Sequence, residues 1–78
     1  MTQFDTIKSA KNLKLIRKKM GFTQKQLGDL IGIAQCTVAL CENGLRNLSI
    51  RHCYKLIEIA KKHDMKIEFN YLRPVKND

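Results

Sequence analysis

Apolar residues recur at intervals of three and four along most of the chain, and this pattern predicts four helices. We expect them over residues 9–20, 24–31, 34–43 and 50–63. The apolar positions predicted to face the core are Leu13, Ile16, Met20, Leu27, Leu30, Ile31, Ile50, Cys53, Ile57 and Ala60. The fold class that follows is mainly α, with four to five helices.

Capping residues and glycines mark where these helices begin and end. Thr23 and Gln26 have the spacing of a capping box at the start of the second helix. Gly32 separates the second helix from the third, and Asn43-Gly44 is suited to close the third. The second and third helices are therefore short and separated by only a few residues.

Residues 65–72 alternate between apolar and polar side chains, which is typical of a β-strand. A solitary strand leaves its backbone polar groups unpaired, so this one needs a partner. We predict that residues 66–72 of two chains pair as an antiparallel ribbon, with Ile67, Phe69 and Tyr71 as dimerisation residues. Pairing with residues 2–7 of the same chain is the alternative. Residues 1–78 then form a single domain, with a core at 9–63 and a loose tail at 73–78.

Basic residues outnumber acidic ones by 15 to 7, which gives a net charge of +8 and favours a polyanionic partner. The basic residues cluster before residue 23 and after residue 44, whereas residues 23–44 are nearly neutral. This distribution indicates a central segment that reads bases and flanks that hold phosphates. Charge alone also fits RNA, but aromatic pairs that could stack on bases are missing from the basic segments.

The remaining chemistry of the chain predicts neither a metal, nor a cofactor, nor an enzyme. Cys36, Cys41 and Cys53 are odd in number and lack a CxxC pair, so we expect reduced thiols. His52 and His63 have no evident nucleophile partner. The chain has no apolar run of about 18 residues and no secretory signal, so we expect a cytoplasmic protein without a membrane partner.

Two short helices separated by about three residues around a glycine have the spacing of a helix-turn-helix. Gly28 lies inside the first of them, where glycine costs about 1 kcal/mol relative to alanine. We expect glycine there because the two helices must pack closely at this position, where a larger side chain would push them apart. The predicted apolar seam between them consists of Leu27, Ile31, Ile33, Val38 and Cys41.

Residues 13–60 resemble the phage-repressor and Cro-type helix-turn-helix family, also called the xenobiotic-response-element type. The matching stretches are LKLIRKKMGFTQKQLGDLIGIAQCTVALCENG and LRNLSIRHCYKLIEIA. The features that coincide are Gly21, Thr23-Gln24, Leu27, Gly28, Gly32, Gln35, Thr37-Val38 and Glu42-Asn43-Gly44. The resemblance implies a transcriptional repressor that binds a palindromic operator in double-stranded DNA as a homodimer.

The resemblance also implies roles for particular residues. It gives base readout to Gln35, Cys36, Ala39 and Leu40. It gives phosphate contacts to Thr23, Gln24, Thr37, Asn43, Gly44 and Arg46, and a structural ion pair to Arg17 and Glu42. Three of the four readers lack the polar groups that the family often has there, so we expect Gln35 to carry direct readout, with its amide on adenine. The other three, Cys36, Ala39 and Leu40, are expected to touch thymine methyl groups.

Short members of this family with a strand directly after the fourth helix resemble antitoxins that pair with kinase-type toxins. An antitoxin that binds both its own operator and a toxin protein is therefore the alternative function. The sequence leaves the choice between this reading and a phage-type regulator open.

Overall fold

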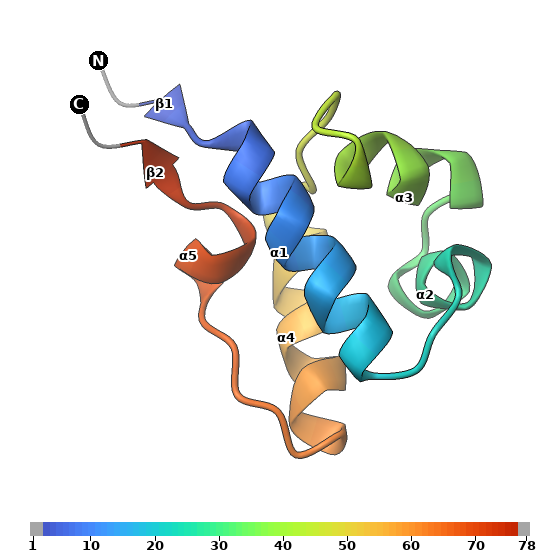
Figure 1. The fold of residues 1–78 in the computed structure, drawn as a ribbon. Coiled ribbons are helices and arrows are strands. Elements are labelled where there is room, and N and C mark those ends of the chain that lie inside the picture. Colours follow the sequence, from blue (N-terminus) through green and yellow to red (C-terminus); the bar gives the residue numbers. More distant parts are fainter. Residues whose placement is uncertain (1–2, 77–78) are drawn as a thin grey trace.

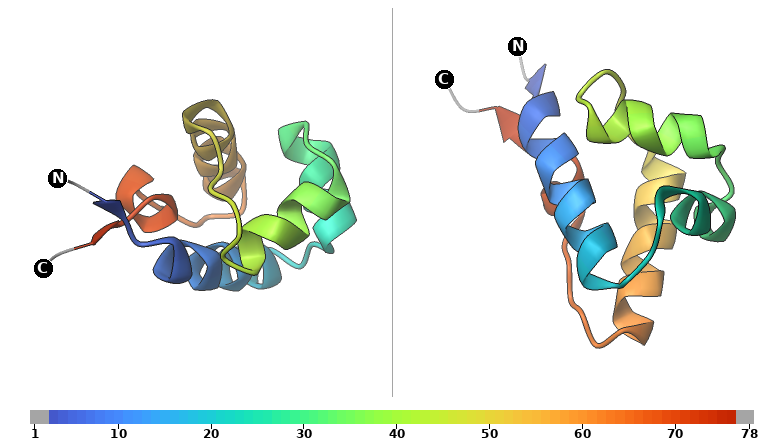
Figure 2. Two further views of the ribbon diagram at one scale, coloured as in Figure 1. Left: turned by 90° about the horizontal axis from the view of Figure 1, so that it is seen from above. Right: turned by 45° about the vertical axis from the view of Figure 1, so that its right-hand side comes forward.

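Helix α1 (Thr6–Lys19) runs through the middle of the fold, with the other helices arranged around it (Figure 1). The structure, a computed structural model, describes residues 3–76. The remaining elements are α2 (Gln24–Ile31), α3 (Gln35–Glu42), α4 (Ile50–Lys62), α5 (Phe69–Leu72) and the short strands β1 (Gln3–Phe4) and β2 (Val75–Lys76). Helices α2 and α3 lie on one side of α1, α5 lies on the other, and the views of Figure 2 agree with this arrangement.

The core is formed where α1, α2, α3 and α4 meet. Its fully buried side chains include Leu27, Ile31, Val38, Cys53, Leu56 and Leu72. The seam predicted between α2 and α3 is confirmed, with Ile33 only partly buried at its margin. Two predicted core positions are wrong: Leu30 is 44% exposed and Ile50 is 55% exposed. On α4 the buried stripe runs through Leu56, while Ile57 is half-buried.

Capping side chains fix the helix starts. The predicted capping box is present, since Thr23 Oγ1 accepts from the Gln26 amide at 3.1 Å and Gln26 Oε1 accepts from the Thr23 amide at 2.9 Å. Helix α1 begins at Thr6, three residues before its predicted start. The reason is Asp5, whose carboxylate accepts the Lys8 amide at 3.0 Å and caps the helix.

Gly28 and Gly32 make the close approach of α2 to α3 possible. A Cβ on Gly28 would lie 2.6 Å from the carbonyl oxygen of Ile33 and 3.4 Å from Val38 Cγ2. Gly32 ends α2 with a φ of 84°, a left-handed conformation that favours glycine. The turn between the two helices therefore depends on the absence of a side chain at one position and on a positive φ at the other.

The predicted strand over residues 66–72 is wrong. Residues 65–68 belong to no helix or strand, with Glu68 in the extended region (φ −102°, ψ 161°), and Phe69–Leu72 forms the one-turn helix α5. Tertiary contacts override the alternating pattern: Ser9 Oγ donates to the Leu72 carbonyl at 2.6 Å and Asn12 Nδ2 donates to the Tyr71 carbonyl at 2.8 Å.

The side chains predicted to dimerise through this strand pack on the core of their own chain instead. Ile67, Phe69 and Tyr71 are all half-buried against it. The structure therefore does not support the predicted ribbon of residues 66–72.

The strand pairing that the structure does contain lies within the chain. Strands β1 and β2 are antiparallel, with Gln3 opposite Lys76 and Phe4 opposite Val75. The N-terminal partner agrees with the alternative raised for residues 2–7, but the strand opposite it is Val75–Lys76. This strand lies in the segment expected to be a loose tail, of which residues 77 and 78 fall outside the described part of the chain.

Candidate nucleic-acid interface

Helix α3 has a buried face and an outward face, and the predicted base readers lie on the outward one. Gln35 and Cys36 are exposed in its first turn, Leu40 is exposed one turn later and Ala39 is half-buried. Val38 and Cys41 occupy the opposite face and are buried against the rest of the core. Positions three and four apart share a helix face, so the four predicted readers form one continuous surface.

The start of α2 offers donors to an anion. The capping box uses the backbone N–H groups of Thr23 and Gln26, and those of Gln24 and Lys25 have no acceptor among residues 3–76. Free N–H groups at a helix N-terminus, together with the helix dipole, favour phosphate. The Gln24 side chain is anchored there, since its Nε2 donates to Glu42 Oε1 at 3.2 Å.

An ion pair between Arg17 and Glu42 joins α1 to the end of α3. Arg17 Nε donates to Glu42 Oε2 at 2.6 Å, and Nη2 donates to Oε1 at 3.0 Å. Arg17 Nη1 also donates to the Phe22 carbonyl at 2.8 Å, just before α2. The pair expected from the sequence is thus present in the structure, and together with Gln24 it connects α1, α2 and α3.

The loop after α3 supplies further predicted phosphate contacts. Asn43 and Arg46 are exposed, and Gly44 is half-buried. Arg46 and Thr37 line a small pocket together with Ser49 and His52 at the start of α4.

His52 also lies at this surface and was not expected there from the sequence. Its imidazole Nδ1 lies 2.8 Å from Ser49 Oγ, the hydroxyl that caps α4. The signal that could have found it is the spacing of a serine N-cap and a histidine three residues later, directly after a basic loop.

Only one of the three free cysteines, Cys36, is exposed, and it lies on the outward face of α3. Burial raises the pKa of the Cys53 thiol to about 11, against a smaller lowering by Arg73 and a further raising by Cys41. Burial also raises the pKa of Cys41. Within the described residues, no group of three or more potential metal ligands occurs, and no helix is long and apolar enough to cross a membrane.

Comparison with known proteins gives three findings. The helix-turn-helix family matches residues 13–63, which is more than half of the chain. Antitoxin HipB of Escherichia coli O6:H1 is 37% identical over 49 residues, which make up 63% of this chain and 52% of HipB. The chain therefore spans about half the length of that curated relative. The crystal structure of the restriction-modification controller protein C.AhdI from Aeromonas hydrophila superposes with a TM-score of 0.68 at 31% identity, covering 87% of this chain and 96% of that chain.

Proposed function

Because the chain belongs to the phage-repressor and Cro-type helix-turn-helix family and is a DNA-binding transcriptional regulator, we propose that it represses from a palindromic operator as a homodimer. The observation that carries this proposal is the outward face of α3. It presents Gln35, Cys36 and Leu40 while its inner face is fixed against α1 and α2. A rigidly held helix with an accessible N-terminal turn suits the major groove.

Within the groove, Gln35 is the proposed direct reader. Its amide has one donor and one acceptor in the arrangement that adenine N7 and N6 complement. Cys36, Ala39 and Leu40 present small or apolar surfaces, which suit the methyl group of thymine. This set favours half-sites rich in A·T pairs, with DNA shape contributing at positions that no side chain touches.

Phosphates on either side of the groove would be held at two places. The first is the start of α2, where Thr23 and Gln24 lie beside the free N–H groups. The second is the far end of α3, where Asn43, Gly44 and Arg46 follow the helix. Thr37 is half-buried and lines the small pocket together with Arg46.

Because residues 66–72 do not form the predicted strand, a homodimer needs another contact surface, and we propose the exposed apolar side chains of α4. Ile50 and Tyr54 are 55% and 56% exposed and one helical turn apart. The Tyr54 ring also stacks on Phe69 of α5, with ring centroids 5.3 Å apart, so α4 and α5 form one apolar surface. Burying it against a second copy satisfies the twofold symmetry that a palindromic site requires.

Footprinting on DNA upstream of the chain's own gene tests the proposed function. We expect a protected twofold-symmetric site whose halves lie about one DNA turn, ~34 Å, apart. Tyr54→Glu should make the protein monomeric in sedimentation and weaken that footprint, whereas Leu15→Glu on α1 should do neither. A protected site without symmetry, or a Tyr54→Glu protein that stays dimeric, would contradict the proposal.

The second candidate is an antitoxin that binds its operator and a toxin protein. The 37% identity to antitoxin HipB over the matched residues supports it. Purification from the native host distinguishes the two candidates. A stoichiometric co-purifying protein favours the antitoxin, and its absence under conditions that retain DNA binding favours a regulator without a toxin partner.

A further inference from the structure

A groove lined by both polar and apolar side chains runs along α1 on the side away from α2 and α3. Its other wall is the chain between α4 and β2, which includes the extended segment, residues 65–68. Ile16, Ile67 and Tyr71 contribute apolar surface to it. In Figure 1, α1 lies between α5 on one side and α2 and α3 on the other, so a ligand bound between α1 and the residues before α5 would leave the proposed DNA-reading face free.

The Met65 N–H and the Glu68 carbonyl are bonded within the chain, but the backbone groups between them are unpaired in the described part of the chain. The N–H groups of Lys66, Ile67 and Glu68 donate to no acceptor within residues 3–76, and the carbonyls of Met65, Lys66 and Ile67 accept from no donor there. Exposed and half-buried side chains alternate along the segment, as they do along a strand. Unpaired backbone groups on an extended segment are the template on which another strand adds.

Both ends of the extended segment are fixed to the rest of the fold. At its start, the Met65 amide donates to the Ala60 carbonyl at 2.9 Å. Beyond its end, the carbonyls of Tyr71 and Leu72 accept from Asn12 and Ser9 of α1. A segment held in place on both sides loses little conformational freedom when a partner binds, which favours association.

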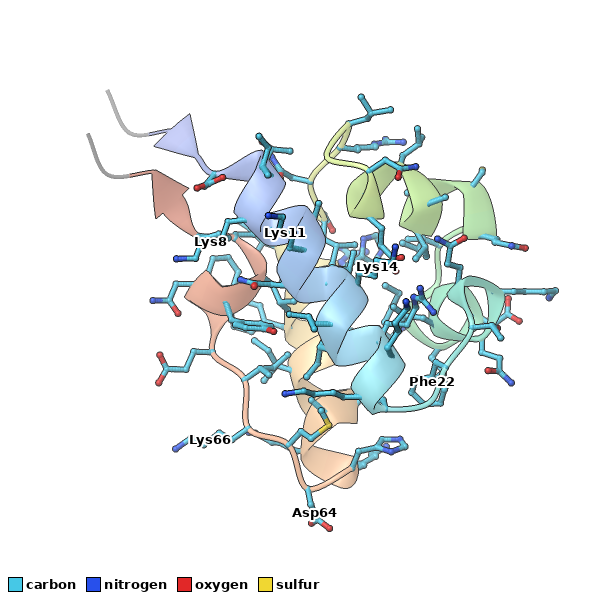
Figure 3. All side chains as sticks on the ribbon, in the orientation of Figure 1. Lys8, Lys11, Lys14, Phe22, Asp64 and Lys66 are labelled. Carbon is cyan, nitrogen blue, oxygen red and sulfur yellow. The ribbon has the colours of Figure 1, made fainter. Side chains whose placement is uncertain are left out.

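The charges around the groove select the partner. Lys8, Lys19 and Lys66 line it and are exposed, and Glu68 is the one acidic lining residue in the described part of the chain. Figure 3 shows Lys8 on α1 and Lys66 on the extended segment at the same edge of the molecule. Three lysines around the half-buried Ile67 and Tyr71 suit a chain that alternates acidic and apolar side chains.

We propose that the extended segment and its groove bind an extended acidic segment of a partner protein, which pairs with residues 65–68 as an added β-strand. The main-chain hydrogen bonds supply affinity, and the lysines select acidic side chains. A second copy of this chain is a poor occupant of this groove, because its own copy of the groove brings the same three lysines.

The test uses the full chain, labelled with ¹⁵N, and a short blocked peptide of alternating valine and glutamate as the probe. We expect the peptide to shift the amide signals of residues 65–68 and of the groove side of α1, and to slow hydrogen exchange at residues 66–68. Signals from α2 and α3 should not move. No binding, or shifts confined to α2 and α3, would overturn the proposal.

Matched controls separate strand pairing from simple charge attraction. A valine–lysine peptide should not bind, and a valine–glutamate peptide with methylated backbone nitrogens should bind much more weakly. Lys8→Glu and Lys66→Glu should each weaken binding about two- to fivefold. Lys55→Glu, with its ammonium near Gly32 at the end of α2, should leave binding unchanged. Equal binding of the methylated peptide would overturn the strand-addition mechanism. Slow hydrogen exchange at amides 66–68 without peptide, at high protein concentration, would instead assign this surface to a second copy of the chain.

Discussion

Arg17 and Glu42 form a two-point ion pair between α1 and the end of α3, with N–O distances of 2.6 and 3.0 Å. The side chains are only 11% and 3% exposed, so water screens the pair weakly. Gln24 donates to the same carboxylate from the start of α2. The orientation of α3, and hence of the proposed readers, therefore depends on one buried carboxylate.

Replacing the Glu42 carboxylate tests how much it stabilises the fold. Glu42→Gln leaves the Arg17 guanidinium buried without a counter-charge, so the free energy of unfolding should fall by about 3 kcal/mol in urea denaturation. The matched control is Asp29→Asn, because the Lys25–Asp29 pair has side chains 70% and 69% exposed. We expect that change to cost less than about 1 kcal/mol. Equal losses in the two variants would refute a special role for the buried pair.

Gly28→Ala tests the close approach of α2 to α3. Alanine favours a helix by about 1 kcal/mol over glycine, but its Cβ would lie 2.6 Å from the Ile33 carbonyl oxygen. Because that oxygen belongs to the backbone, we expect a net loss of about 1–3 kcal/mol in thermal or urea unfolding. Lys25→Ala, at an exposed position of the same helix, should change little. A Gly28→Ala protein more stable than the parent would contradict the account of the turn.

The sequence predicted the helix-turn-helix well because its determinants are local. The Thr23–Gln26 box, the short spacing around Gly32 and the seam through Leu27 all lie within a few residues of one another. Their geometry follows from helix periodicity and capping, which do not need the rest of the fold.

The C-terminal part could not be predicted because its determinants are distant in the sequence. Alternation from Ile67 to Tyr71 fits a strand, yet α5 forms where Leu72 is buried and its carbonyl accepts from Ser9 Oγ at 2.6 Å. Leu30 fits the helical stripe, but it is 44% exposed. The position of His52 beside Arg46 depends in the same way on how α4 starts next to the loop.

The three thiols should react at very different rates. Cys36 is exposed on α3, whereas Cys41 and Cys53 are buried and burial raises the pKa of both. In the native protein, iodoacetamide should therefore modify Cys36 first, as mass spectrometry of the digested protein can measure. Bound operator DNA should protect Cys36. Undiminished modification of Cys36 in a saturated complex would place it outside the interface.

Arg46 and Gln24 should affect DNA binding in different ways. Arg46→Ala removes an ionic phosphate contact, so the slope of log K against log salt should become shallower by up to about one unit. Gln24→Ala should weaken binding to all sequences similarly and leave the slope nearly unchanged, because it removes no charge. Binding titrations at several salt concentrations measure both. An Arg46→Ala protein with altered base preference and an unchanged slope would show that Arg46 does not act as a phosphate contact.

The most direct test of the central claim, that α3 reads DNA sequence through Gln35, is to select binding sites from a pool of random duplexes with the parent protein and with Gln35→Ala. We predict that the parent enriches a twofold-symmetric motif with A·T pairs at fixed positions. Gln35→Ala should lose roughly 1–3 kcal/mol of binding free energy on that motif and much less on random DNA. It should also lose the preference for adenine at the matching position. If both proteins enrich the same motif with the same base preference, the claim that α3 reads DNA sequence through Gln35 is contradicted.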